Sequence, residues 1–264
     1  MQIEFINQTN DTNISMHSMS RDGLYGDGFF TTGLIKMGKF LHWDYHLERL
    51  LFSASRLYYT DFILETLRTS LEKLIKDIEH SAFRISVTRY QKKRGYGISE
   101  SALSLCRLQL FPTVRTASLS CHLVFANTPI SVNPYFAGIK HLNRLDNVLA
   151  ASEIKSDDQE TLMFNGETVV SGSRSNLFVL EEGEWYTPAI DIAGVNGITR
   201  LRILKVMEEH GIACNKSQIS RGDLDNIEAA FICNSLIGVW PAKSINSKSL
   251  SIKPSLTIQE LLND

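Results

Sequence analysis

Lys140 is the residue whose surroundings in the sequence point most directly to chemistry. The residues before it, 136–139, are small or apolar, and a helical pattern of apolar residues begins at Leu142. An amine in such company is partly desolvated, which lowers its pKa toward the neutral form that attacks carbonyl groups. The alternative is a solvated lysine that simply precedes a helix, and this segment alone favours that alternative.

Three further segments carry groups that suit an anion. In GVNGITR two glycines lead into a helix, so Ile198 and Thr199 would present N–H groups at its positive end. Arg49 lies on a predicted helix, and Asn234 and Ser235 end a hydrophobic strand. Each segment also has an ordinary explanation, namely a common helix entrance, a surface arginine and a turn.

The elements that would position these residues fall into two domains. In the first, 1–112, residue alternation predicts strands at 29–36, 82–90 and 103–111. Apolar residues at helical spacing predict one helix that begins at Asp44 as its N-cap and another over 62–79. Together they form a strand–helix–helix–strand unit.

A linker at 113–118 leads to the second domain, 119–264. Strands are predicted at 118–127, 229–235 and 238–245, with several short strands between them, and a helix is predicted over 194–211. A last helix is predicted over KPSLTIQELL (253–262), and its Thr257 and Glu260 are interpreted as a capping box. Many short strands with few helices predict an α+β fold rather than a regular parallel sheet.

The composition excludes several classes of protein. The chain has 264 residues, 43% of them hydrophobic and 21% charged, which is ordinary for a globular protein. A net charge of −2 gives no bulk attraction to nucleic acid or to an anionic membrane. The four cysteines form no CxxC pair, so neither a metal site nor a disulfide framework is predicted. The N-terminus lacks an apolar signal segment, and a cytoplasmic protein is expected.

Seven motifs together resemble the fold-type IV enzymes that depend on pyridoxal 5'-phosphate (PLP), the branched-chain and D-amino-acid aminotransferase family. The chain is most similar to the aminodeoxychorismate lyase branch of that family. The motifs run nearly from end to end: YGDGFFTT (25–32), HLERL (46–50), RGYG (94–97), AGIKHLNRLDNVLA (137–150), SNLF (175–178), AGVNGITR (193–200) and ICNSL (232–236). The resemblance implies two domains with PLP between them, and usually a homodimer.

The resemblance also implies a role for each matching residue. Lys140 would bind PLP covalently, and Arg49 would hold the phosphate of the cofactor. Ile198 and Thr199 would complete the phosphate site, which agrees with the helix N-terminus inferred from the residues alone.

On the other side of the phosphate the resemblance places Asn234 and Ser235. Arg94 and Tyr96 fall on a loop that approaches the carboxylated substrate.

Ser171 departs from the family. Members carry a glutamate five residues before the asparagine of the NLF motif, where it keeps the pyridine nitrogen of PLP protonated. Glu167 is the nearest acid, and strand alternation would place it on the same face, roughly 13 Å away. A serine hydroxyl can donate to the nitrogen but supplies no charge, so the electron sink is expected to be weaker.

The activity implied is a lyase that converts 4-amino-4-deoxychorismate to 4-aminobenzoate and pyruvate in folate biosynthesis. One alternative is an aminotransferase for D- or branched-chain amino acids, and Ser171 counts against it because transamination relies more on a protonated pyridine. The other is a PLP-binding protein with impaired catalysis. Ser171 favours that reading, whereas Lys140, Arg49 and the GVNGITR motif oppose it.

Overall fold

The computed structural model describes residues 2–6, 21–91, 95–113 and 118–263. The chain forms two compact units, one of Met1–Val114 with Ile139–Asn143 and one of Arg115–Gly138 with Arg144–Asp264. The sequence did not predict that 139–143 belongs to the first unit. Lys140 is therefore carried by the first unit, although it was assigned to the second domain.

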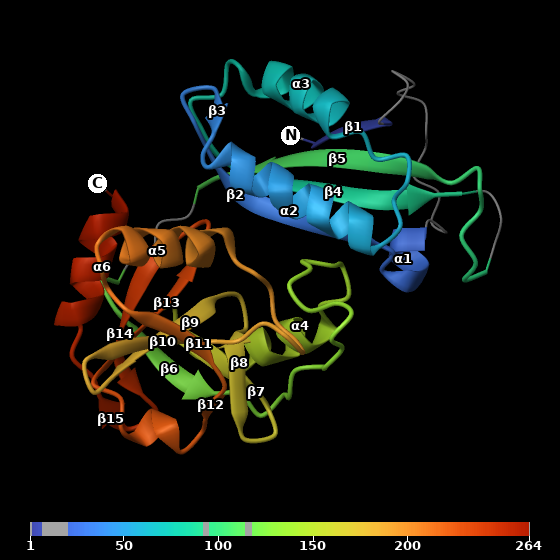
Figure 1. Ribbon diagram of the computed structural model, residues 1–264. Coiled ribbons are helices and arrows are strands. Elements are labelled where there is room, and N and C mark those ends of the chain that lie inside the picture. Colours follow the sequence, from blue (N-terminus) through green and yellow to red (C-terminus); the bar gives the residue numbers. More distant parts are fainter. Residues whose placement is uncertain (1, 7–20, 92–94, 114–117, 264) are drawn as a thin grey trace. The chain divides into compact units, whose positions relative to one another are not determined.

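An antiparallel sheet of five strands, in the order β1-β5-β4-β2-β3, forms the first unit (Figure 1). Its strands are β1 (Gln2–Ile6), β2 (Gly28–Lys36), β3 (Lys39–Phe40), β4 (His80–Tyr90) and β5 (Leu103–Phe111). The predicted strands 29–36, 82–90 and 103–111 are thus confirmed as β2, β4 and β5.

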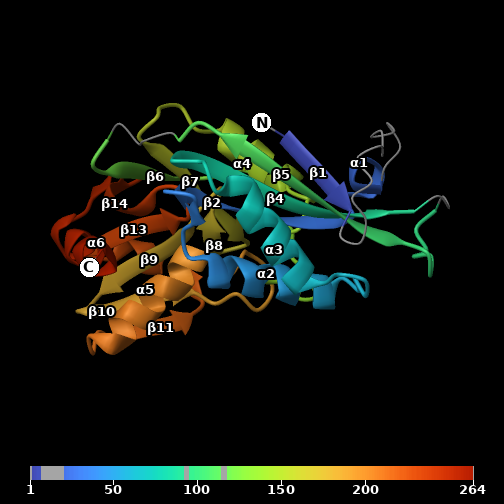
Figure 2. The same ribbon diagram turned by 90° about the horizontal axis from the view of Figure 1, so that it is seen from above.

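Helices α2 (Trp43–Arg56) and α3 (Leu64–Ile75) lie over this sheet (Figure 2). Their apolar faces and one face of the strands bury a common core, to which Leu50, Leu67, Phe29 and Phe83 contribute fully buried side chains. A short helix, α1 (Arg21–Tyr25), precedes β2. Helical spacing in α2 and α3 and alternation in the strands are therefore satisfied by the same core.

The second unit is a ten-stranded mixed sheet in the order β11-β10-β9-β13-β14-β6-β7-β8-β12, with β15 paired to β14. Three neighbouring pairs are parallel, β10 with β11, β14 with β6, and β6 with β7. The strands are β6 (Cys121–Phe125), β7 (Gln159–Asn165), β8 (Thr168–Gly172), β9 (Asn176–Glu181), β10 (Glu184–Pro188), β11 (Cys214–Ser217), β12 (Ile219–Ser220), β13 (Ala229–Asn234), β14 (Gly238–Ile245) and β15 (Lys248–Ser249). Two sheets that contain many antiparallel pairs confirm the α+β prediction.

Both faces of the central strands of this sheet are buried. On β9, Leu177 packs into one core, whereas Phe178 packs into another that includes Ile203 of α5 (Ile198–Glu209) and Ile258 of α6 (Lys253–Asn263). Strand residues alternate between the faces, so a continuous apolar run is what a strand buried on both sides requires. A third helix, α4 (Leu145–Ser152), follows the Lys140 segment.

Two predicted helix caps are wrong. Helix α2 begins at Trp43 after His42, so Asp44 lies in the first turn and is not the N-cap. Helix α6 begins at Lys253, so Thr257 lies inside it and its hydroxyl donates to the Lys253 carbonyl (3.5 Å) rather than capping the helix. Local spacing identified both helices, but a proline in the first turn of α6 already suits a helix start before the predicted box.

Glu167 is also placed differently from the prediction. It lies in the turn between β7 and β8, with an exposed side chain whose carboxylate is 3.6 Å from Arg221 Nε. The register of these strands shifts between Met163 and Phe164, so simple alternation does not extend through the hairpin. Glu167 therefore supplies no carboxylate on the strand that carries Ser171. No helix within the described ranges is long and apolar enough to cross a membrane.

Candidate active site

The segment that carries Lys140 runs beside the N-terminal end of β2 in the first unit. The Phe30 amide donates to the Lys140 carbonyl (2.9 Å), and the Leu142 amide donates to the Gly28 carbonyl (3.0 Å). Ile139 is fully buried in the core of this unit. The Lys140 side chain therefore departs from a main chain that hydrogen bonds and core packing hold in place. The same pairing explains why the helical pattern that starts at Leu142 becomes α4 only from residue 145.

The Lys140 amine lies in a cationic and aromatic setting. Its Nζ is 4.6 Å from the centre of the Phe30 ring, and Arg84 Cζ is 3.9 Å from the same centre. Arg84 is half-buried, its Nε donates to Ser86 Oγ (3.1 Å), and burial followed by the nearby Arg107 lowers its pKa. Cations gathered on one partly buried sheet face create a positive potential that favours an anionic ligand.

Arg49 lies on α2 with its guanidinium directed at β2. Its Nη1 donates to Thr31 Oγ1 (3.4 Å), and that oxygen lies 2.6 Å from Nδ1 of His46. Burial, followed by repulsion from Arg49, lowers the pKa of His46 to about 3. The imidazole is therefore neutral at physiological pH and can accept a hydrogen bond from the Thr31 hydroxyl, which leaves Arg49 as the charged group of this trio.

In the second unit, the N-terminus of α5 is suited to an anion. The helix starts at Ile198 after Gly197, and no side chain in the described part of the chain caps it. Ile198 and Thr199 are both buried. The first N–H groups of a helix lack intrahelical partners and carry partial positive charge, so an anion satisfies both requirements.

Gly197 gives this helix entrance its shape. A Cβ at that position would lie 1.9 Å from Oδ1 of Asn176, whose Nδ2 donates to the Val195 carbonyl (2.9 Å). Because Asn176 is buried, it could not yield without breaking that hydrogen bond. Only glycine at position 197 lets the first residue of β9 hold the loop before α5.

Arg200 adds a buried positive charge in the first turn of α5. Its guanidinium donates to Thr187 Oγ1 (3.2 Å), Asn196 Oδ1 (3.2 Å) and the Pro188 carbonyl (3.1 Å). Among the described residues these acceptors are all neutral, and burial lowers the pKa of Arg200. A cation held by neutral groups in a buried location is stabilised by any anion that binds at the helix end.

Ser171 is buried on β8, opposite Met163 of β7. Glu160 is an acid whose carboxylate contacts the loop that follows Ser171, and its side chain is fully buried. The Glu160 carboxylate accepts hydrogen bonds from Thr161 N, Ser173 N, Ser173 Oγ, Arg174 Nε and Ser175 Oγ. Glu160 is therefore committed to shaping the loop between β8 and β9, and it does not replace the family glutamate.

Asn234 and Ser235 lie where β13 runs into a turn of the second unit. Asn234 Oδ1 accepts from the amides of Leu236 (2.9 Å) and Ile237 (3.0 Å), and Nδ2 donates to the Arg174 carbonyl (3.2 Å). Both ends of the carboxamide are thus engaged with backbone groups. The phosphate role expected of Asn234 stays a prediction, and its side chain would serve it by holding the turn that presents Ser235.

Gly138 joins the Lys140 segment to the loop before α5. Its φ of +84° requires glycine, its amide donates to the Gly194 carbonyl (3.0 Å), and its carbonyl accepts from the Asn196 amide (3.2 Å). Along the chain, Lys140 follows two residues later. The main chain that carries the lysine is thus covalently continuous with the segment that pairs with the α5 entrance.

Of the two residues expected to approach the substrate, the structure describes Tyr96 but not Arg94. Arg94 lies outside the described residues. Tyr96 has an 84% exposed side chain, and its ring centre lies 5.0 Å from that of Tyr25. No group of three or more His, Cys, Asp or Glu side chains in the described ranges is arranged to hold a metal.

The donors present fit a cofactor that combines an aldehyde with a phosphate. Lys140 offers an amine, and Arg49, the α5 N-terminus and Arg200 offer charge and hydrogen-bond donors for a dianion. The sequence analysis did not identify three residues of the candidate site, namely Asn176, Arg200 and Arg84. Asn176 and Arg200 lie inside motifs that matched the family, whereas nothing in the alternating pattern of its strand singled out Arg84.

A lysine amine and a set of donors suited to a phosphate are groups that a PLP-dependent enzyme uses, and the comparison with family models agrees with such an enzyme. Residues 28–245 match the family of class IV amino-transferases, and the chain belongs to that family. The protein is therefore an enzyme, and the family to which it belongs is PLP-dependent.

Individual relatives show which members of the family the chain is similar to. The chain is 28% identical over 232 residues to the aminodeoxychorismate lyase of Vibrio harveyi, which covers 84% of each chain. It superimposes on the crystal structure of 4-amino-4-deoxychorismate lyase from Pseudomonas aeruginosa with a TM-score of 0.91 and 27% identity, covering 99% of this chain and 98% of that one. A D-alanine aminotransferase of Listeria innocua is 27% identical over 258 residues, 90% of this chain and 84% of the relative.

Proposed function

We propose that this enzyme is a cytoplasmic PLP-dependent lyase that converts 4-amino-4-deoxychorismate to 4-aminobenzoate and pyruvate. The observation that carries the proposal is the Lys140 amine, which lies against the Phe30 ring of β2, a ring that the Arg84 guanidinium also contacts. It provides a nucleophilic amine in a setting that attracts an anionic substrate. The similarity to two lyases of this name supports the choice of reaction.

The residues that would hold the cofactor are the lysine and the phosphate donors described above. Lys140 would bind it covalently, while Arg49, the Ile198 and Thr199 backbone and the Arg200 charge would receive the phosphate. PLP, when bound, withdraws electrons from the carbon that bears the amino group of the substrate. The site residues predicted from the sequence thus keep their proposed roles, with Arg200 added to them.

Lys140 would then act as the base. Its neutral amine would remove the proton from the amine-bearing ring carbon of the substrate. The bond from the neighbouring ring carbon to the enolpyruvyl oxygen breaks, the ring becomes aromatic, and the released enolpyruvate takes up a proton to give pyruvate. Arg84 would face a carboxylate of the substrate, which carries two, and the Tyr96 loop would approach it as the family resemblance implies.

An aminotransferase remains the second candidate because the D-alanine aminotransferase of Listeria innocua is also similar. Ser171 and the fully engaged Glu160 argue for the lyase, since neither supplies a free carboxylate for the pyridine nitrogen. Aromatisation drives the lyase reaction, so a weaker electron sink is tolerable there. Incubating the holoenzyme with 4-amino-4-deoxychorismate should release pyruvate and 4-aminobenzoate without a keto-acid acceptor. Turnover only with an acceptor would overturn the proposal.

Ser171→Glu is expected to raise transaminase side activity while changing the lyase rate less. A carboxylate at this position would keep the pyridine nitrogen protonated, whereas a buried cation without a partner loses its proton. Nitrogen NMR with labelled PLP should show a largely unprotonated nitrogen in the wild type and a protonated one in the variant. Ser171→Ala is the matched control and should gain no transaminase activity. A protonated nitrogen in the wild type would contradict the argument.

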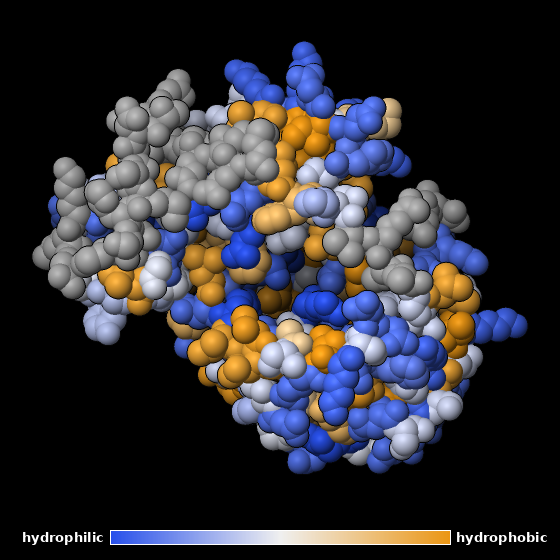
Figure 3. Space-filling model, turned by 180° about the vertical axis from the view of Figure 1, so that it is seen from behind, coloured by the Kyte–Doolittle hydropathy of each residue, from blue (hydrophilic) through white to orange (hydrophobic). Residues whose placement is uncertain are grey.

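A homodimer is proposed as the assembly. Helix α4 of the second unit presents Leu145, Val148 and Leu149, which are 71%, 60% and 49% exposed. Figure 3 shows apolar side chains gathered in patches between polar ones on the surface. Exposed leucine and valine on one short helix favour contact with another protein surface, here a second copy of the chain. Light scattering should give twice the 29.8 kDa chain mass, and a monomer at micromolar concentration would refute the dimer.

A further inference from the structure

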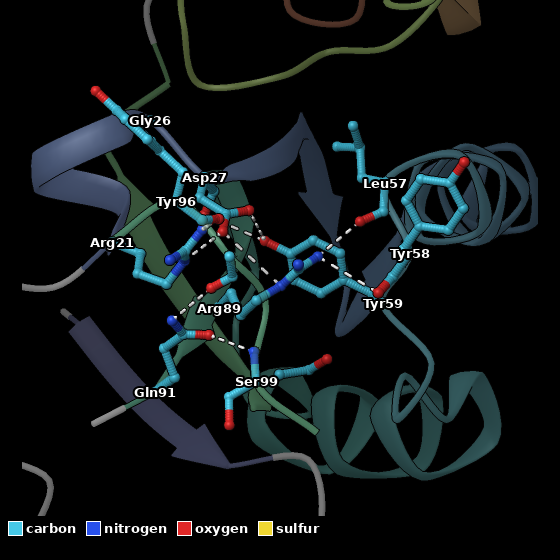
Figure 4. A network of polar contacts seen from close by, with 12 residues as sticks. Arg21, Gly26, Asp27, Leu57, Tyr58, Tyr59, Arg89, Gln91, Tyr96 and Ser99 are labelled. Carbon is cyan, nitrogen blue, oxygen red and sulfur yellow. Dashed lines mark hydrogen bonds and ion pairs between the residues drawn. The ribbon is translucent and has the colours of Figure 1, made fainter. Parts of the chain in front are cut away.

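Arg21 donates two hydrogen bonds to the loop that carries Tyr96 and one to Asp27, just before β2 (Figure 4). Its Nε donates to the Asp27 carboxylate (2.7 Å), its Nη1 to the Gly95 carbonyl (2.7 Å) and its Nη2 to the Tyr96 carbonyl (3.1 Å). Arg21 is only 8% exposed, although it belongs to a five-residue helix near the chain's start. One buried guanidinium thus holds two consecutive carbonyls that lie 74 and 75 residues further along the chain.

Asp27 and Arg89 extend this network into the body of the first unit (Figure 4). Asp27 Oδ2 lies 3.8 Å from Arg89 Nε, and Asp27 Oδ1 accepts from the Tyr59 hydroxyl (3.2 Å). Arg89 Nη2 donates to the Leu57 carbonyl (2.6 Å) at the end of α2. Two arginines and one carboxylate, all largely buried, therefore tie the loop to β4 and α2.

Among the described residues of the loop, apolar burial contributes little to its position. Tyr96 and Ile98 have exposed side chains, and a Cβ at Gly95 or Gly97 would meet no atom within 4 Å. Besides Arg21, Gln91 supports the loop: its Nε2 donates to the Gly97 carbonyl (3.0 Å), and its Oε1 accepts from the Ser99 amide (3.0 Å). Polar contacts to its backbone, rather than apolar burial, determine where this loop lies.

The same strand end that holds Arg21 also holds the lysine segment. Asp27 stands between Gly26, whose carbonyl accepts from Asn143 Nδ2 (3.3 Å), and Gly28, whose carbonyl accepts from the Leu142 amide. Gly26 has a φ of +63°, and a Cβ there would lie 2.3 Å from Asn143 Oδ1. The contacts of Asp27 and its neighbours thus connect the Tyr96 loop to the segment that carries Lys140.

We propose that Arg21 is a positioning residue for substrate recognition: it fixes the Gly95–Tyr96 backbone directly, and its bond to Asp27 keeps that backbone in register with the Lys140 segment, so that the Tyr96 loop meets an anionic substrate in one position. The inference rests on the proposed function for its substrate, but the clamp itself is a property of the fold. Arg21 needs no contact with substrate to act. Its loss should weaken recognition and leave the chemistry of Lys140 in place.

Fluorine NMR of the holoenzyme labelled with fluorotyrosine tests the clamp without any substrate. The Tyr96 signal, assigned with Tyr96→Phe, should be displaced in the wild type by the neighbouring Tyr25 ring. In Arg21→Ala it should narrow and move to the position of free fluorotyrosine. Arg21→Lys, which keeps the charge but not the fork of donors, should fall between the two. Arg68→Ala removes a half-exposed arginine of α3 and should change nothing.

Steady-state kinetics then test the role in recognition. With 4-amino-4-deoxychorismate, Arg21→Ala should raise KM by about tenfold or more and keep kcat within about threefold, with unchanged PLP loading. An unmoved Tyr96 signal in a folded Arg21 variant would refute the clamp, and a normal KM with a released Tyr96 would refute its role. If Arg21→Ala does not fold, Arg21→Lys decides both points. Absence of pyruvate from the wild type would refute the proposed function alone, since the fluorine NMR spectrum tests the contact between Arg21 and the Tyr96 loop independently.

Discussion

Lys140→Ala is expected to lose turnover by at least about three orders of magnitude. The variant removes the amine that would bind the cofactor and the base that would take the substrate proton in one change. Such groups act as a unit, so no second residue restores the loss. The Lys140 main chain is held by its carbonyl bond to Phe30, and the fold should therefore survive the substitution. Circular dichroism and the melting temperature should match those of the wild type.

Chemical labelling gives this prediction a second readout. Borohydride reduction of the PLP-loaded protein, followed by peptide mapping, should place the pyridoxyl group on the peptide that contains AGIKHLNR. Lys39→Ala, at an exposed lysine of β3, is the matched control and should keep both label and activity. Label on another lysine of the wild type would overturn the assignment of Lys140.

Arg49→Ala is expected to weaken PLP binding by about 30- to 1000-fold. Loss of a charge-assisted contact to the phosphate is worth about 2–4 kcal/mol, which corresponds to that range. Because His46 stays neutral, no neighbouring charge in its hydrogen-bonded trio takes over. Equilibrium dialysis or the absorbance change on PLP binding would give the dissociation constant.

Two substitutions control this measurement. Arg49→Lys keeps the charge but not a bidentate geometry, so an intermediate affinity is expected. Arg56→Ala removes a half-buried arginine from the last turn of the same helix, where it stacks on Phe52, and should leave PLP affinity unchanged. An unchanged dissociation constant in Arg49→Ala would count against its role at the phosphate.

The elements of the fold were largely predictable from local spacing. Alternation identified β2, β4 and β5, and helical spacing identified α2, α3 and α5, because each pattern reports which side of an element faces the core. Element starts were less predictable. The N-cap of α2 is His42 at φ 56°, a residue that no capping preference favours, and it is set by the tight β3–α2 connection.

The sequence by itself determined which residues were candidates for chemistry, since Lys140, Arg49 and the glycine-rich entrance of α5 are recognisable by type and by neighbours along the chain. The tertiary structure alone decided what holds them. Arg21 is hydrogen-bonded to Gly95, 74 residues further along the chain, and Asn176 to the carbonyl of Val195, 19 residues further. The Glu160 carboxylate accepts hydrogen bonds from the loop after Ser171. The reason is physical: a buried polar group must find a partner, and only the folded chain determines which distant group is within reach.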